Sequence, residues 1–277
     1  MNMKTNKYKI LVLTDLKDST KNVLRSTANL CKMIDGDVSL FHVKNPIDIV
    51  ERESQLSAFR NISEKQTATK KQIEKFVNQI KEEHNLVVQY SYTFGNVKNE
   101  IEDYIIKHKP DIIVLGKRKS KLFSFGDNVT DFVLNAFDGI VLISGNDNPV
   151  EFNEEISLGL LDSNNPFENI GFTNKLMKQT KQPLKAFKVV NKGDNLPKAT
   201  NNSISKMVEY VFERSDSTVQ NLTNYLSKSN INLLLIDGNF RNTSKNTGLN
   251  QSDVKNVINQ LDMSLLISNN KNFSKIL

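Results

Sequence analysis

Short apolar runs alternate with amphipathic stretches along the first half of the chain. The apolar runs have the length of buried strands and occupy residues 9–15, 38–43, 86–94, 111–116 and 140–144. Apolar residues recur at helical spacing in the segments between them, near residues 18–34, 54–84, 97–109 and 129–137. Five strands alternating with four helices predict an α/β fold with a mainly parallel sheet that is covered on both faces.

The second half repeats this order of elements. ISLGLLD at 156–162 corresponds to KILVLTD at 9–15, and LLIS at 265–268 corresponds to VLIS at 141–144. The other predicted strands of this half are residues 187–190, 208–212 and 231–238, and Val254, Val257, Ile258 and Leu261 mark the buried face of a helix. An internal duplication explains the matching order better than chance does.

The repeat predicts two tandem domains at 1–147 and 151–277, joined by the turn-rich connector GNDNPV. In the second domain, the long second helix is replaced by the polar stretch 191–205, so we expect an exposed apolar surface or a ligand cleft on its sheet. We also expect the closing strands VLIS and LLIS to pair edge to edge, between the halves or between subunits.

Composition excludes several classes of protein. The chain is 38% apolar and 25% charged, which is typical of a soluble globular protein, and no apolar run approaches the length of a membrane span or signal sequence. We therefore expect a cytoplasmic protein that does not bind membranes. The net charge of +6 is divided evenly between the halves, without the clustered basic stripe of a specific nucleic-acid binder.

Cysteine and histidine usage gives little support to redox or metal chemistry. Cys31 is the only cysteine, and its place on the apolar side of a predicted helix favours a buried structural thiol over a redox role. His42, His84 and His108 are far apart in the sequence, so no metal site is expected.

Five segments, in this order and spacing, resemble the universal stress protein family in its tandem two-domain form. They are KILVLTD ending at Asp15, LFHV at 40–43, FGNVKNEI at 94–101, PDIIVLGKR at 110–118, and GDNVTDFVLNAF followed by GIVLIS at 126–144. The resemblance implies adenine-nucleotide-hydrolase-like (Rossmann-like) domains that pack like a dimer, as a pseudo-dimeric monomer or a homodimer.

The resemblance also implies where a nucleotide would bind. Asp15 stands at the position of an acidic residue that contacts the nucleoside, and Val43 at that of a backbone contact. Gly116 matches the first glycine of the phosphate-binding pattern G-x2-G-x9-G-(S/T). Small residues in that pattern let backbone N–H groups approach phosphate oxygens near a helix N-terminus.

The rest of the phosphate pattern departs from the family. Lys119 occupies the second glycine position, and Asp127–Asn128 stand before Val129 where the Gly-(S/T) pair belongs. An aspartate there would repel phosphates, whereas Lys117, Arg118 and Lys119 could bind them in place of backbone donors. Two simpler interpretations stay open: a solvated basic loop, and an Asp15 that only caps the following helix.

Three functions follow from these observations. The first is a non-enzymatic stress-response or regulatory protein that senses ATP, ADP or AMP through its first half. The second is a nucleotide-independent adaptor that acts through protein partners, and the third is a slow ATP hydrolase. The sequence has none of the motifs GxxxxGK(S/T), GxSxG or HExxH, so no catalytic residue is assigned. In the second half, Asp162 and Gly238 persist without a phosphate pattern, which favours packing and partner recognition.

Overall fold

The computed structural model describes residues 7–45, 55–117, 129–145, 150, 156–161, 172–178, 180, 183–193, 207–237 and 249–269. The chain divides into two compact units, Met1–Phe137 and Asp138–Leu277. The strand at 140–144 therefore belongs with the second unit by its contacts, whereas the sequence repeat assigns it to the first domain. The domain boundary drawn from the repeat stays a prediction.

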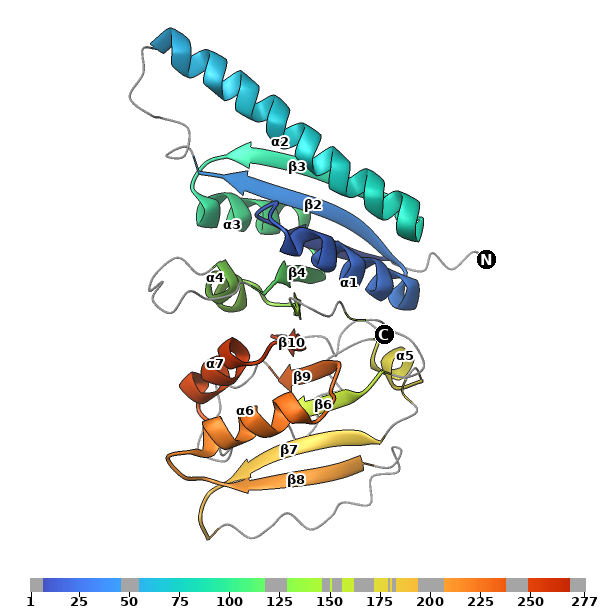
Figure 1. Cartoon of the computed structure of the whole chain (residues 1–277), viewed down its shortest axis with the longest axis vertical. Helices are drawn as coiled ribbons and strands as arrows, with labels where there is room; N and C mark the ends of the chain where they lie inside the picture. Colours follow the sequence, from blue (N-terminus) through green and yellow to red (C-terminus); the bar gives the residue numbers. More distant parts are fainter. Residues whose placement is uncertain are drawn as a thin grey trace. The chain divides into compact units, whose positions relative to one another are not determined.

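The described part of the first unit has four parallel strands in the order β3-β2-β1-β4 (Figure 1). Their bounds are β1 Tyr8–Leu13, β2 Gly36–Lys44, β3 Val88–Phe94 and β4 Ile112–Gly116. From β1 the chain adds β2 and β3 on one side and then β4 on the other. Loops at the carboxyl ends of β1 and β4 therefore lead to opposite faces of the sheet and leave a crevice between them.

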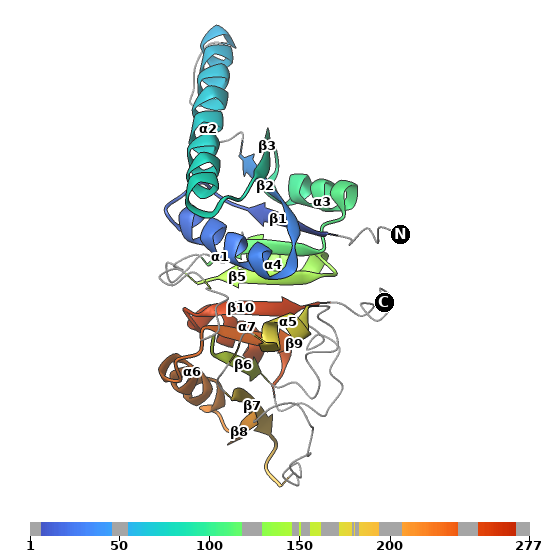
Figure 2. The ribbon, with the colours of Figure 1, turned by 90° about the vertical axis from the view of Figure 1, so that its right-hand side faces the viewer.

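Helices cover both faces of this sheet. They are α1 Ser19–Ile34, α2 Gln55–His84, α3 Val97–His108 and α4 Val129–Ala136. α1 packs on α2, β1 and β4, while α3 packs on β2 and α4. Figure 2 shows α1 and α2 on the side of the sheet opposite α3. Ile112, Ile113 and Val114 are completely buried, as expected of a strand that is covered on both faces.

Among its described residues, the second unit has six strands in the order β5-β10-β9-β6-β7-β8. Their bounds are β5 Ile140–Ser144, β6 Leu158–Leu161, β7 Leu184–Val190, β8 Met207–Glu213, β9 Leu233–Asp237 and β10 Ser264–Ser268. The strands from β10 to β8 are parallel, and β5 pairs with β10 in antiparallel orientation, with Leu142 opposite Leu266. The expected pairing of the VLIS and LLIS strands is confirmed.

Both units place their strands in the same arrangement. The order β8-β7-β6-β9 in the second unit repeats the order β3-β2-β1-β4 in the first, which supports the duplication inferred from the sequence.

The helices described in the second unit are α5 Thr173–Lys178, α6 Thr218–Lys228 and α7 Gln251–Gln260. α6 is not among the predicted elements. α7 begins with a capping box between Asn250 and Asp253, and the apolar residues expected on its inner face are buried.

The third strand begins at Val88 rather than Leu86: Asn85 follows α2 with a positive φ of 53°, and Val87 is 71% exposed. The polar stretch predicted in place of the second helix lies mostly outside the described residues. Met207, Val208 and Val211 of the end strand β8 are 38–40% exposed, but Val208 lies on the opposite face of the strand from the other two. The expected apolar surface or ligand cleft stays a prediction.

Cys31 lies on α1 and is half-buried rather than buried. Burial and then the nearby carboxylates of Asp35 and Asp37 raise the pKa of its thiol to about 12. At pH 8 the native chain should therefore react with iodoacetamide at least about a hundredfold more slowly than the urea-unfolded chain, because only the thiolate is the nucleophile. Equal alkylation rates in the two states would contradict this environment.

No helix in the described ranges is long and apolar enough to cross a membrane.

Candidate functional site

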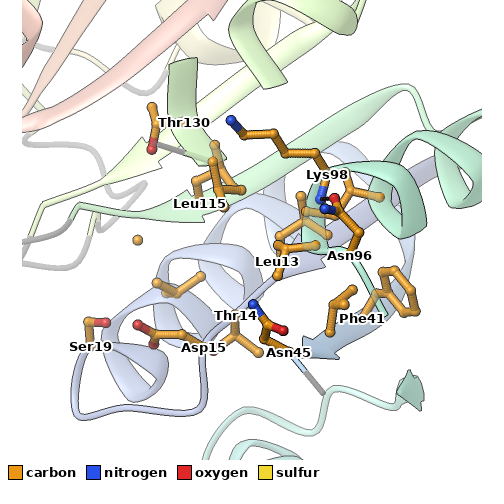
Figure 3. Close-up of a pocket in the computed structure, with 16 residues that line it drawn as sticks. Leu13, Thr14, Asp15, Ser19, Phe41, Asn45, Asn96, Lys98, Leu115 and Thr130 are labelled. Carbon is orange, nitrogen blue, oxygen red and sulfur yellow. Dashed lines mark hydrogen bonds between the residues drawn. The ribbon is translucent and has the colours of Figure 1, made fainter. Parts of the chain in front are cut away.

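A cavity of about 370 Å³ opens at the carboxyl ends of β1, β2 and β4, in the crevice formed where the strand order reverses. Its size falls at the lower end of the range of about 300–1,000 Å³ that small-molecule pockets occupy. The first turns of α1, α3 and α4 also border it. Figure 3 shows polar side chains around its rim, with Asp15 and Ser19 at the lower border and Lys98 and Thr130 at the upper border.

The loop after β1 is held in place by contacts from several elements. Thr14 Oγ1 accepts a hydrogen bond from the Leu16 amide at 3.0 Å and bonds to Thr20 Oγ1 of α1 at 2.7 Å. Gln72 Nε2 of α2 donates to the Leu16 carbonyl at 2.7 Å. Leu16 itself has a φ of 60°, an uncommon conformation for a residue with a side chain, and these contacts maintain it.

His42 on β2 fixes the same loop from the other side. Its Nδ1 lies 2.8 Å from the Thr14 carbonyl oxygen, and because a carbonyl can only accept, Nδ1 carries the proton. Burial lowers the pKa of His42, with the hydrogen bond to Thr14 acting in the opposite direction. The neutral imidazole therefore serves as a fixed donor that holds the backbone just before Asp15.

Asp15 lines the cavity and does not cap α1. Its Oδ1 accepts from the Lys17 amide at 3.1 Å, and its Oδ2 lies 3.7 Å from the Lys17 ammonium. The N-cap residue of α1 is Asp18. The interpretation of Asp15 as only a helix cap is therefore wrong. Its carboxylate is 24% exposed, and it stabilises the turn while facing the cavity.

Apolar side chains line part of the cavity between these polar borders. Leu13, Phe41 and Leu115 come from the ends of three neighbouring strands. The ring of Phe41 stacks on Tyr104 of α3 at a centroid distance of 4.3 Å, which sets its orientation. Such walls with a few placed polar groups suit a ligand that has a flat apolar part and a polar or charged part.

Four of the residues predicted for the site line this cavity, namely Asp15, Val43, Gly116 and Val129. Lys117 follows Gly116 directly, is half-buried and is not among the described residues that line the cavity. Arg118, Lys119, Asp127 and Asn128 lie outside the described residues. The roles predicted for all nine site residues stay predictions. The structure shows only that Asp15, Val43, Gly116 and Val129 line the same cavity.

Sequence reasoning missed several polar residues of the cavity, namely Ser19, Asn45, Asn96, Lys98 and Thr130. Asn45 directly follows β2, and Asn96 directly precedes α3, so both stand where strands of a parallel sheet end. The segment FGNVKNEI carried a signal for Asn96 and Lys98, since it joins the end of a strand to a helix.

Within the ranges that the structure describes, no cluster of three or more His, Cys, Asp or Glu side chains could hold a metal ion.

Comparison with known proteins agrees with this architecture. Residues 8–143 match the sequence model of the universal stress protein family. A solved universal stress protein from Archaeoglobus fulgidus DSM 4304 is similar over 96% of this chain and 99% of its own, with 15% identity and a TM-score of 0.68. A putative universal stress protein from Pseudomonas aeruginosa UCBPP-PA14 is similar over 94% of this chain and 92% of its own, with 11% identity and a TM-score of 0.52.

A further structure, of a universal stress protein in complex with cAMP, is similar over 52% of this chain and 100% of its own, with 12% identity and a TM-score of 0.40. No curated protein sequence matches the chain significantly. At these identities the solved structures show the fold alone. Through residues 8–143 the chain belongs to the universal stress protein family.

Proposed function

We propose that the protein is a non-enzymatic regulatory protein that binds an adenine nucleotide in the cavity of its first unit. The observation that carries the proposal is the placement of Asp15 in a cavity of about 370 Å³ at the carboxyl ends of β1, β2 and β4. In open parallel sheets, ligands bind at this location, where the strand order reverses. We further propose that the protein acts in the cytoplasm and that the second unit serves packing and partner recognition.

Each part of such a ligand has a complementary part of the cavity. The apolar walls, including Phe41 and Leu115, suit the faces of a purine ring. The Asp15 carboxylate accepts hydrogen bonds and suits the hydroxyl or amino donors of a nucleoside. The side-chain amides of Asn45 and Asn96 offer both donors and acceptors, which suit the nitrogen atoms along the edge of a base.

The direct test is calorimetric titration of the purified, nucleotide-stripped protein with adenosine, AMP, ADP, ATP and cAMP, with and without Mg²⁺. We expect saturable binding that Asp15→Asn weakens about tenfold or more, because a hydrogen bond to a charged group is lost. The asparagine keeps an oxygen that can accept from the Lys17 amide, so the turn should remain. Asp18→Asn, three residues away and exposed, is the matched control and should bind like the wild type.

Two results would change the assignment. If no ligand gives a binding heat, and the far-UV circular dichroism spectrum shows that the protein is folded, the proposal of nucleotide binding is wrong. That result would favour an adaptor that acts through protein partners. Release of ADP and phosphate from ATP by the wild type, and not by Asp15→Asn, would show a slow hydrolase instead of a non-enzymatic protein.

A further inference from the structure

Lys98 is the one cation, and Asp15 the one anion, among the described residues that line the cavity. Lys98 lies in the first turn of α3, and its side chain is half-buried. In Figure 3 it extends from the α3 side along the border that carries Thr130, while Asp15 and Ser19 occupy the other border. The described part of the cavity therefore has a negative and a positive end.

Local hydrogen bonds and packing fix the backbone position of Lys98, from which its side chain extends. Asn96 is the N-cap of α3, and its Oδ1 accepts from the Lys98 amide at 3.1 Å and the Asn99 amide at 3.3 Å. One turn further along, Ile101 is 3% exposed and anchors the helix against the sheet. The Gly95 amide donates to the Lys44 carbonyl at 3.1 Å, which ties the residue before the cap to the end of β2. The backbone of Lys98 is thus fixed relative to the cavity.

We propose that Lys98 makes the cavity selective for phosphorylated ligands by binding a phosphate group of the nucleotide through its ammonium group. This inference rests on the proposed function and adds the residue that distinguishes a nucleotide from its nucleoside. The Asp15 carboxylate attracts hydroxyl and amino donors and repels phosphate, so the anionic part of a ligand turns to the other end. There the Lys98 ammonium supplies the opposite charge.

Thr130 adds to this end of the cavity. It lies in the first turn of α4, and its side chain borders the same part of the cavity as Lys98 in Figure 3. A threonine hydroxyl donates one hydrogen bond to a phosphate oxygen.

The sequence predicts that the basic residues 117–119 bind phosphate in place of the missing glycine. We assign that role instead to Lys98 on α3.

The test compares adenosine with AMP and cAMP in wild type, Lys98→Gln, Lys98→Arg and Lys107→Gln. Lys107 is an exposed residue of the last turn of α3 and is the matched control. We expect Lys98→Gln to weaken AMP and cAMP binding about tenfold, which corresponds to about 1.4 kcal/mol, and to change adenosine binding less than about twofold. Lys98→Arg should keep most of the preference for AMP, and Lys107→Gln all of it.

Salt gives a second readout. Wild-type affinity for AMP should fall as ionic strength rises, and the affinity of Lys98→Gln should fall much less, because the screened charge pair is gone. If Lys98→Gln binds AMP and adenosine as the wild type does, the proposal for Lys98 is overturned and the nucleotide site stands. An equal loss for adenosine and AMP would give Lys98 a structural role and also overturn it. Failure of folded wild type to bind any of these ligands overturns the proposed function and this inference together.

Discussion

Replacing Leu40 with alanine is expected to lower the free energy of unfolding by about 2–5 kcal/mol. Leu40 is completely buried at the centre of β2, where it lies opposite Val12 of β1 and Tyr90 of β3. Truncation removes apolar atoms from the core and leaves a space that the sheet on either side cannot fill by relaxing. The measurement is urea unfolding of the full chain, followed by circular dichroism.

Two further variants test whether the loss of stability comes from burial and whether it is confined to the first unit. Val87→Ala removes apolar atoms from a side chain that is 71% exposed and should change stability by less than about 0.5 kcal/mol. Leu234→Ala in β9 is equally buried, but in the second unit. If the units unfold separately, Leu40→Ala and Leu234→Ala will shift different transitions. A Leu40→Ala midpoint no lower than that of Val87→Ala would refute the packing described for the first sheet.

Gly116→Ala is expected to lower both stability and ligand affinity. A Cβ atom at Gly116 would lie 2.8 Å from Val23 Cγ2 and 3.4 Å from Ser19 Oγ, and all three residues line the cavity. Val23 is 2% exposed and belongs to α1, so it can move only by disturbing the packing of that helix. Overpacking of this kind costs about 1–3 kcal/mol. In the proposed function it also narrows the nucleotide cavity, and we expect AMP affinity to fall at least about tenfold.

The chain offers a matched pair of controls for this substitution. Gly159→Ala in β6 would place a Cβ 2.8 Å from Ile231 Cδ1 and should destabilise the second unit without changing nucleotide binding. Adding Val23→Ala to Gly116→Ala makes room for the new methyl group and should restore part of both stability and affinity. Unchanged AMP binding by folded Gly116→Ala would place the ligand elsewhere.

The sequence alone determined the order of most elements, although α5 and α6 were not predicted. Strands and helices follow from hydrophobic periodicity, which each segment shows by itself, and completely buried residues such as Val114 and Leu266 lie in runs that were already apolar in the sequence. Asp15 lies two residues beyond the end of β1, and the resemblance to the family singled it out as a site residue. The pairing of β5 with β10 followed from the repeated VLIS and LLIS segments.

Only the tertiary structure decided which side chains meet. Asp18, and not Asp15, stands at the N-cap position of α1, and the loop before it is held by Gln72, which is 56 residues away from Leu16 in the sequence. Lys98 reaches the cavity because α3 packs on β2 and α4; the segment FGNVKNEI places it at the start of a helix but does not show which residues it meets there. Periodicity is a property of one segment, so most of the elements were predictable. A binding site requires several distant segments to pack together, and six of the seven polar residues described in the cavity lining were not predicted as site residues.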